Sequence, residues 1–415
     1  MTRPWSAAEA ERYLLGLELF GMRFGLDRMR RLMTVLGHPE RALDAIHVVG
    51  TNGKSSTVRM IAAVLERHGL RCGAYLSPHL VEFPERIRVD EHDLDPHAFA
   101  AAVQRVAGAA AMVDRTLEAG DRVTQFEALT AAAYAELAAR GVDAAVVEAG
   151  LGGRYDATSV IESRVQVLTN VGLEHQRWLG PTLRDIAREK LAVVRPGGTL
   201  VCGHLAPEVE EEAHAAADAA GARLVFAPAD PGVPVAAPGA FQRRNFAVAL
   251  SATEAFLRHL DAVAVREAAA SVQVPGRMQV VQQDPLTIVD GAHNPSGMAA
   301  LVDALPEVAA GRRVVAVVSV LDDKDAATML RALLPVCSAA VFTHASNPRA
   351  YSPATLASLA DQLGFADAHL EPDPHAALRR ARELAGPDGA VLATGSIYLV
   401  ADVAAGPGQR RASTL

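Results

Sequence analysis

Lysine is scarce in this sequence. Only three of the 40 basic residues are lysines, Lys54, Lys190 and Lys324, and the rest are arginines. Acidic residues outnumber basic ones, 48 to 40, so the formal net charge is −8. This sign argues against a protein held on nucleic acid or an anionic membrane by bulk charge, and we expect neither as a partner. Arginine offers neither a compact ammonium nor a neutral amine, so each lysine is a candidate for chemistry that arginine cannot perform.

Cysteines and long apolar runs are also sparse. The three cysteines, Cys72, Cys202 and Cys337, lie far apart without metal-ligand spacing, which fits a reducing compartment and no disulfide framework. No apolar run approaches the roughly 20 residues of a membrane helix, and the N-terminal stretch is charged where a signal peptide is apolar. We therefore expect a cytoplasmic protein. The hydrophobic fraction of 50% and the length of 415 residues predict a folded chain of about two domains.

Two series of β-branched runs alternate with alanine-rich segments of helical periodicity. This alternation predicts βαβ units around parallel, buried sheets. The runs lie at 46–52, 144–150, 165–170 and 199–203, and then at 287–294, 313–321, 339–345 and 390–396. A Pro/Gly-rich region at 227–239 and a helical segment separate the two series. We place the boundary at the VPGR segment, which predicts domains of residues 1–274 and 275–415, with a frayed tail after about Ala404.

The strongest local motif is GTNGKSST at residues 50–57, between the run IHVV and a helical segment. In such a glycine-rich turn, backbone N–H groups and the positive end of a helix face an anion, and Lys54 adds a point charge for nucleotide phosphates. A hydroxyl after the lysine can reach Mg²⁺. Val48 stands where the Walker A spacing has a glycine, which disfavours motor-type ATPases and GTPases. The competing interpretation is a glycine turn with an unrelated lysine.

A metal–nucleotide site also needs a carboxylate on a neighbouring strand. Glu148 ends the apolar run DAAVV, at the edge where open α/β sheets bind ligands. A charged residue in that position is rarely without function, although a glutamate facing solvent is the alternative. His175 follows another predicted strand and is a second candidate ligand. Its alternative is a loop histidine that bonds to its surroundings.

Nine segments add a further pattern. They are HVVGTNGKSST, YLSPHLVEFPERIRV, VTQFEALTAAAY, VVEAGLGGRYDATS, TNVGLEHQRWLG, IAREKLAVVRPG, PGRMQ, VDGAHNP and LDDKD. In this order they resemble the folylpolyglutamate synthase/dihydrofolate synthase family of the Mur ligase superfamily, over nearly the whole chain. The resemblance implies an α/β fold: a Mur-ligase-like P-loop ATPase domain with a parallel-rich sheet that binds ATP and a pterin or folate, and a smaller Rossmann-like C-terminal glutamate ligase domain.

The resemblance also implies roles for single residues. The ATP-binding set is Gly50, Thr51, Asn52, Gly53, Lys54, Ser55, Ser56, Asn245, Arg277 and Asp290. The ligands of two Mg²⁺ ions are Ser77, Glu148, His175 and Lys190, the last as a carbamate made with CO₂, with Ser55 as a further ligand. The pterin-side set of bifunctional members is Met22, Arg23, Phe24, Thr124, Gln125, Phe126, Glu127, Tyr155, Asp156 and Ala157. The catalytic residues are Lys54, Lys190 and His293.

Several of these residues have a structural alternative. Asp290 would cap the following helix, His293 would satisfy a backbone group, Arg277 would be a hinge residue, Glu127 would face water, and Lys190 would be an ordinary helix lysine. Lys324, in LDDKD, faces the cleft in the family pattern, and the resemblance assigns it no firm role.

The sequence departs from the family pattern at three positions. Ser55 replaces a glycine, Glu174 an aspartate and Ser159 an asparagine. We expect Ser55 to take a share of the Mg²⁺ coordination otherwise left to Ser77. Glu174 and Ser159 keep the polarity of the residues they replace, so we expect altered geometry rather than lost activity.

The implied function is ATP-dependent amide formation. The resemblance implies a ligase that joins L-glutamate to dihydropteroate and extends folates through γ-glutamyl links, by way of an acyl phosphate, with the second domain closing over the first. ATP is the co-substrate, and we expect a monomer. A monofunctional folylpolyglutamate synthase is the first alternative, a cell-wall Mur-type ligase the second, and a non-catalytic nucleotide-binding protein the third.

Overall fold

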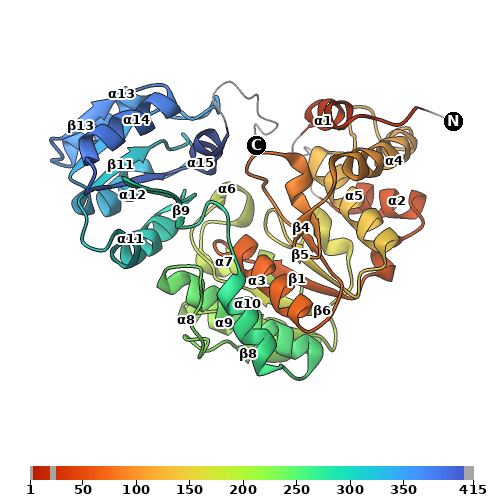
Figure 1. The fold of residues 1–415 in the computed structure, drawn as a ribbon. Helices are drawn as coiled ribbons and strands as arrows, with labels where there is room; N and C mark the ends of the chain where they lie inside the picture. Colours follow the sequence, from red (N-terminus) through yellow and green to blue (C-terminus); the bar gives the residue numbers. More distant parts are fainter. Residues whose placement is uncertain (1–2, 19–24, 406–415) are drawn as a thin grey trace. The chain divides into compact units, whose positions relative to one another are not determined.

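A computed structural model describes residues 3–18 and 25–405 of the chain. These residues form two compact units (Figure 1). The first unit comprises the described residues up to Ala236 together with Arg243–Val272, and the second comprises Ala237–Gln242 and the described residues from Gln273 onward. The functional division of the chain at residue 274 stays a prediction. The tail expected to fray lies, from residue 406 onward, outside the described residues.

An eight-stranded sheet forms the centre of the first unit, in the order β4-β3-β2-β5-β1-β6-β7-β8. Its strands are β1 (Ala45–Val49), β2 (Cys72–Tyr75), β3 (Ile87–Val89), β4 (His92–Asp93), β5 (Ala144–Glu148), β6 (Ser163–Leu168), β7 (Thr199–Cys202) and β8 (Arg223–Phe226). The six strands from β2 to β8 in this order are parallel, and β3 and β4 add an antiparallel edge. Every residue of β1 and β5 is buried, as central parallel strands covered on both faces require.

Helices and short 3₁₀ turns connect these strands. They are α1 (Ala7–Leu15), α2 (Asp27–Val35), η1 (Pro39–Ala42), α3 (Lys54–Arg67), η2 (Phe83–Arg86), α4 (Pro96–Asp114), α5 (Gln125–Arg140), η3 (Ala157–Val160), α6 (Gln176–Leu179), α7 (Leu183–Leu191), α8 (Pro207–Ala220), α9 (Ala240–Leu257) and α10 (Ala262–Ser271). Helix α3 packs against β1, β2 and β5. Helix α5 begins at a capping box in which Thr124 and Glu127 satisfy each other's backbone N–H groups.

The second unit has its own six-stranded sheet, in the order β13-β12-β11-β14-β10-β9. The strands are β9 (Gln279–Gln283), β10 (Leu286–Val289), β11 (Val314–Val318), β12 (Ala339–Phe342), β13 (Ala368–Leu370) and β14 (Ala390–Thr394). The helices are α11 (Pro295–Ala309), α12 (Ala326–Leu333), η4 (Leu334–Val336), α13 (Pro353–Gln362), α14 (Pro374–Ala385) and α15 (Ile397–Ala404). All strands but β9 are parallel to their neighbours. A core of apolar side chains from β10, β11, β14, α11 and α12 joins the sheet to its helices.

All eight predicted runs contain a strand, but each strand ends before its run does, because the glycines and polar residues at the ends of the runs form loops. Six strands were not predicted. Among them β9 alternates between exposed and half-buried positions, and β4 is two exposed residues at an edge. β2 is buried, but its residues CGAY contain no β-branched side chain. These strands exist because a neighbouring strand offers hydrogen bonds, which the composition of a short segment does not reveal.

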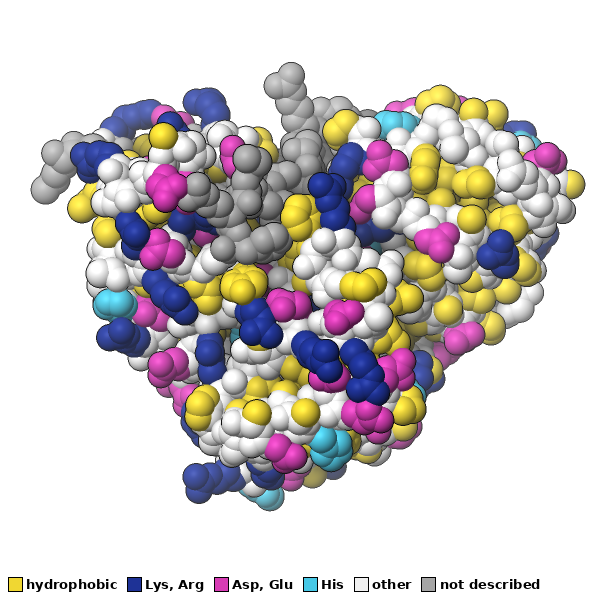
Figure 2. All heavy atoms as spheres, turned by 180° about the vertical axis from the view of Figure 1, so that it is seen from behind, with side chains coloured by type: hydrophobic (Ala, Val, Ile, Leu, Met, Phe, Trp, Pro, Cys, Tyr) yellow, Lys and Arg dark blue, Asp and Glu magenta, His cyan; other side chains and the backbone are white. Residues whose placement is uncertain are grey.

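Charged side chains of both signs lie interspersed on the face of the molecule seen in Figure 2. Among the helices of the described residues, none combines the length and apolarity needed to cross a membrane.

Candidate active site

The loop between β1 and α3 is shaped by two glycines whose neighbours leave no room for a side chain. Gly50 has φ +154°, and a Cβ there would lie 1.9 Å from Thr169 Oγ1. Gly53 has φ +82°, and a Cβ there would lie 2.5 Å from Asn245 Oδ1. Helix α3 then begins at Lys54, so its first N–H groups are directed at the loop. This is the geometry of an anion site at a helix N-terminus, and it places Asn245, from the distant α9, against the loop.

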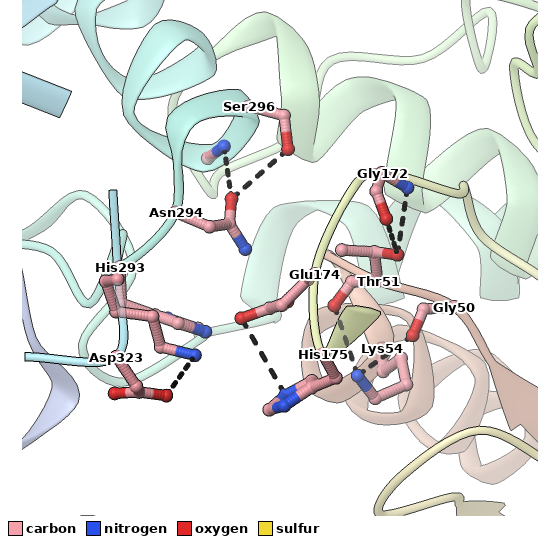
Figure 3. A network of polar contacts seen from close by, with 12 residues as sticks. Gly50, Thr51, Lys54, Gly172, Glu174, His175, His293, Asn294, Ser296 and Asp323 are labelled. Carbon is pink, nitrogen blue, oxygen red and sulfur yellow. Dashed lines mark hydrogen bonds and ion pairs between the residues drawn. The ribbon is translucent and has the colours of Figure 1, made fainter. Parts of the chain in front are cut away.

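The segment after β6 clamps this loop, a feature that the sequence analysis missed. Asn52 N–H donates to Asn170 Oδ1 at 3.0 Å, and Asn170 Nδ2 and Thr169 Oγ1 donate back to the Asn52 carbonyl at 3.0 and 2.7 Å. Thr51 Oγ1 accepts from Gly172 N–H at 2.9 Å (Figure 3). The letters TNVG before His175 were a signal for this clamp, because short polar residues directly after a parallel strand lie at the ligand-binding edge of the sheet.

Two of the three lysines meet at one carbonyl oxygen. Lys54 Nζ donates to the carbonyls of Gly50 and Thr51 at 3.1 and 3.2 Å (Figure 3), and Lys190 Nζ donates to the same Gly50 carbonyl at 2.8 Å. Lys190 is 5% exposed. Burial, and secondly the charge of Lys54, lower the pKa of Lys190 to about 7. The amine is therefore available in its neutral form near neutral pH. Because the side chain is buried, Lys190 is not an ordinary surface lysine.

Glu148 lies beside the first turn of α3. Ser55 Oγ donates to Glu148 Oε1 at 2.9 Å, and the backbone N–H of Ser77 donates to Glu148 Oε2 at 3.1 Å. Glu148 is 1% exposed, so the alternative of a glutamate facing solvent is wrong. A carboxylate beside a serine hydroxyl offers hard oxygen ligands, which suit Mg²⁺ held mainly by nucleotide phosphates and water. The residues present thus fit the expected ion, and Ser55, the departure from the family pattern, is in direct contact with this carboxylate.

His175 has an unusual backbone conformation. It precedes α6 with φ 53°, and its Nε2 lies 3.9 Å from Glu174 Oε1 (Figure 3). The parts of the chain that the structure describes contain no group of three or more His, Cys, Asp or Glu side chains arranged to hold a metal ion. The proposed ligands combine oxygen and nitrogen donors, and phosphate oxygens would complete the coordination of the ion. The role of His175 as a metal ligand stays a prediction.

The pterin-side residues of α5 separate into two groups. The Thr124 hydroxyl, the Gln125 amide and the Glu127 carboxylate are buried and bonded internally: Gln125 Nε2 donates to Leu14 O at 2.9 Å, and Arg28 Nε donates to both Glu127 oxygens at 3.0 and 3.1 Å. Glu127 therefore does not face water. In the second group, the Phe126 ring contacts the loop after β5, because a Cβ on Gly150 would lie 2.6 Å from Phe126 Cζ.

The loop that follows β5 contains the other pterin-side residues. Tyr155 is 51% exposed, whereas Asp156 and Ala157 are buried. Asp156 Oδ2 accepts from Leu151 N–H at 2.8 Å, and Oδ1 accepts from Thr158 N–H at 3.0 Å. Burial raises the pKa of Asp156, and these hydrogen bonds oppose the rise. The remaining pterin-side residues, Met22, Arg23 and Phe24, lie outside the described residues.

The second unit contains its own group of predicted residues. Asp290 is 3% exposed and accepts from Met278 N–H at 2.8 Å and from Ala292 N–H at 2.7 Å. Arg277 lies beside it, since a Cβ on Gly291 would be 2.2 Å from Arg277 Nη1. Burial raises the pKa of Asp290, and Arg277 lowers it. Helix α11 is capped by Asn294, whose Oδ1 accepts from Gly297 N–H at 2.8 Å, so the alternative of Asp290 as that cap is wrong (Figure 3).

His293 and Lys324 also belong to this unit. His293 Nδ1 donates to the Gly291 carbonyl at 2.9 Å, a contact that agrees with the alternative given for His293. Lys324 Nζ forms an ion pair with Asp323 at 3.3 Å, and Arg349 lies 3.9 Å from the same carboxylate.

Known proteins match both the sequence and the fold. Residues 276–397 match the family model "Mur ligase, glutamate ligase domain". The dihydrofolate synthase/folylpolyglutamate synthase of Bacillus subtilis is 32% identical over 424 residues, which cover 95% of this chain and 97% of the relative.

The chain belongs to the dihydrofolate synthase/folylpolyglutamate synthase family. Among solved structures, the Mycobacterium tuberculosis folylpolyglutamate synthase complexed with ADP and AMPPCP matches with a TM-score of 0.90, 31% identity and coverage of 98% of this chain and 99% of that chain. Escherichia coli FolC in complex with DHPP and ADP matches with a TM-score of 0.84, 29% identity and coverage of 96% and 97%. The predicted α/β fold of this synthase family is confirmed.

Proposed function

We propose that this chain joins L-glutamate to dihydropteroate, which makes dihydrofolate, and extends folates by γ-glutamyl links. As a member of its family it is an ATP-dependent ligase. One observation supports the proposal above the others: Lys54 and Lys190 meet at the carbonyl of Gly50 in the phosphate loop. One amine suits a phosphate and the other a modification that needs a neutral lysine. Arginine could not perform the second task, because its guanidinium keeps its charge.

ATP is needed because a carboxylate is a poor acyl donor. The carboxylate of dihydropteroate or of a folate attacks the γ-phosphorus of ATP, forming an acyl phosphate and releasing ADP. Lys54 and the N–H groups at the start of α3 would neutralise the charge on the transferring phosphoryl group. The amine of L-glutamate then attacks the acyl carbon, and the tetrahedral intermediate collapses to an amide and phosphate. The glutamate amine loses its proton in this step.

Ser55, Ser77, Glu148 and His175 would hold Mg²⁺, and Lys190 as a carbamate would add a second carboxylate. Bound Mg²⁺ supplies charge neutralisation of the phosphates. The hydrogen bonds from Ser55 and Ser77 orient the Glu148 carboxylate, so this ligand is positioned before nucleotide arrives. Two ions are proposed because two carboxylates of this kind would be present beside one phosphate chain.

Phe126 and the loop from Gly150 to Ala157 are the proposed pterin-side surface. Phe126 touches this loop, and Tyr155 exposes half of its side chain there. These contacts support the proposed binding of a pterin ring, which dihydropteroate and the folates share. Asn245 is proposed as an ATP contact because it lies against Gly53. Arg277, Asp290 and His293 are proposed as the contribution of the second unit to ATP binding and catalysis.

We also propose the partners, the oligomeric state and the cellular location of this chain. The partners are small molecules, namely dihydropteroate, reduced folates, L-glutamate and ATP, with neither nucleic acid nor membrane. The chain is proposed to act as a monomer in the cytoplasm.

An ADP-release assay tests the proposed function. The purified protein is given ATP, Mg²⁺ and either dihydropteroate or tetrahydrofolate, with and without L-glutamate, and mass spectrometry identifies the products. We expect glutamate-dependent ADP release and a mass gain of one glutamate with both acceptors, and none with Lys54→Met. Turnover of tetrahydrofolate alone would identify a monofunctional folylpolyglutamate synthase. Turnover of a UDP-muramyl acceptor alone would overturn the proposal.

A further inference from the structure

His47 lies at the centre of β1 and is completely buried. A buried imidazole in a parallel strand is costly unless its ring nitrogens bond to something. Its Nε2 lies 2.8 Å from Thr158 Oγ1, in η3, and Thr158 Oγ1 is in turn hydrogen-bonded to Asp156 Oδ1. Three side chains from two distant parts of the sequence thus form one buried chain, His47, Thr158 and Asp156, which ends at the proposed pterin-side loop.

The protons available to these three side chains decide which atom donates in each of their hydrogen bonds. The Asp156 carboxylate only accepts, so the single hydroxyl proton of Thr158 is directed at it. Thr158 Oγ1 therefore has only lone pairs left for His47, and Nε2 of His47 must donate. His47 is consequently the neutral tautomer with its proton on Nε2. Within the described residues its Nδ1 is buried without a hydrogen-bond partner, so a second proton would find no acceptor.

The electrostatics agree with a neutral imidazole at this position. Burial, and secondly the charge of Arg195, lower the pKa of His47 to about 3. Arg195 also donates to the carbonyls of Ser159 and Ile161, the latter at 2.9 Å. It therefore fixes the end of η3 independently of the hydrogen bonds between His47, Thr158 and Asp156. Tyr134 OH donates to the Thr158 carbonyl at 2.7 Å. The backbone of η3 thus has other supports, whereas the Thr158 hydroxyl is oriented by His47.

We propose that His47 is a positioning residue of the ligase: it holds the Thr158 hydroxyl in the direction that fixes the Asp156 carboxylate, and thereby the shape of the loop from Gly150 to Ala157. Asp156 shapes this loop directly, because it accepts from Leu151 N–H at its start and from Thr158 N–H after its end. The inference rests on the proposed function to the extent that this loop contacts the pterin. His47 also lies three residues before Gly50, so one strand supports both the phosphate loop and the pterin-side loop.

A matched pair of variants tests the proposal. Glutamine places its amide nitrogen near the position of Nε2, whereas asparagine places its amide nitrogen near the position of Nδ1. We expect His47→Gln to keep the KM for dihydropteroate within about threefold of the wild-type value. We expect His47→Asn to raise this KM about tenfold, which is the effect of losing one hydrogen bond in a network that ends at a carboxylate. The KM for ATP should change less than about twofold in both. A purely structural residue would not show this pattern.

Thr158→Val supplies a second test if His47→Asn folds poorly. Valine has the shape of threonine without the hydroxyl, so it breaks the chain with little change in packing. We expect it to reproduce the selective rise in KM, and the double variant His47→Asn/Thr158→Val to be no worse than either single variant, because all three interrupt one chain. The ¹⁵N NMR spectrum of histidine-labelled wild-type protein should show His47 protonated on Nε2 only.

Other results would overturn the inference without touching the proposed function. One such result is a Thr158→Val variant with wild-type KM values, and another is an equal rise in the KM values for dihydropteroate and for ATP. The others are a His47→Gln variant whose KM for dihydropteroate is as high as that of His47→Asn, and a proton on Nδ1 of His47. Conversely, a wild-type protein that neither binds nor uses dihydropteroate or a folate would overturn the proposed function and this inference together.

Discussion

Lys190 offers the sharpest test of the proposed chemistry, because the chain has only two other lysines. Carbamate formation joins the neutral amine to the carbon of CO₂ and releases a proton. With a pKa of about 7, roughly nine-tenths of Lys190 is neutral at pH 8, against well under 1% of a lysine with the ordinary pKa of about 10.4. The buried site therefore raises the fraction of neutral, reactive amine by a factor of about 200 at this pH.

The lowered pKa of Lys190 predicts that carbamate formation, and with it activity, decreases as the pH falls. The neutral fraction of Lys190 falls as the pH drops through 7, from about nine-tenths at pH 8 to about one-tenth at pH 6. Protein freed of CO₂ should therefore regain activity on addition of bicarbonate at pH 8, and regain it poorly at pH 6. Lys190→Arg should lose at least about 100-fold in kcat at either pH, because arginine forms no carbamate and keeps its charge.

Carbon-13 NMR after incubation with labelled bicarbonate measures the modification directly. We expect a carbamate signal in the wild type and in Lys324→Arg, and its loss in Lys190→Arg. A signal from the N-terminal amine would persist in all three proteins and serves as an internal control. Lys190→Arg with near-normal turnover, or an active wild type without a carbamate signal, would refute the reasoning.

Four further outcomes follow from the structure. Glu148→Gln should lower kcat/KM about 100-fold and raise the Mg²⁺ concentration at half-maximal ADP release, since an amide replaces a buried anion; unchanged Mg²⁺ dependence would exclude it as a ligand. Gly53→Ala should raise the KM for ATP and lower stability by about 1 kcal/mol or more in urea unfolding, because its Cβ would meet Asn245 and its φ is +82°; wild-type values would show that the loop adapts. In the folded protein His47 has a pKa of about 3, below its unfolded value of about 6.5. Its contribution to the free energy of unfolding is therefore complete above about pH 6.5 and falls by about 1.4 kcal/mol per pH unit as the pH drops below that value. Urea unfolding of the wild type should show this slope, and His47→Gln should lack it. Lys324→Arg should reduce turnover if this lysine serves the chemistry as the other two do, and normal ADP release would make its presence a coincidence.

The local sequence was sufficient for the features that neighbouring residues create. The run IHVV followed by GTNGKSST predicted a strand, an anion-binding turn and a helix, because backbone geometry and helix polarity act over a few residues. Glu148 at the end of an apolar run was found for the same reason: the carboxyl edge of a parallel sheet can be predicted once the strand is recognised. Edge strands such as β4 and β9 were missed, because their partners, rather than their composition, make them strands.

Only the tertiary structure decided which distant side chains share a site and what charge they carry. Asn245 meets Gly53, and Lys190 meets Gly50, across long stretches of sequence. The lowered pKa of Lys190 comes from burial beside Lys54, which no spacing in the sequence expresses. Glu127 was expected among the pterin contacts, and the fold binds its carboxylate to Arg28. Residue types and their order along the chain set the local chemistry, whereas desolvation and the pairing of charges depend on the packing of the whole unit.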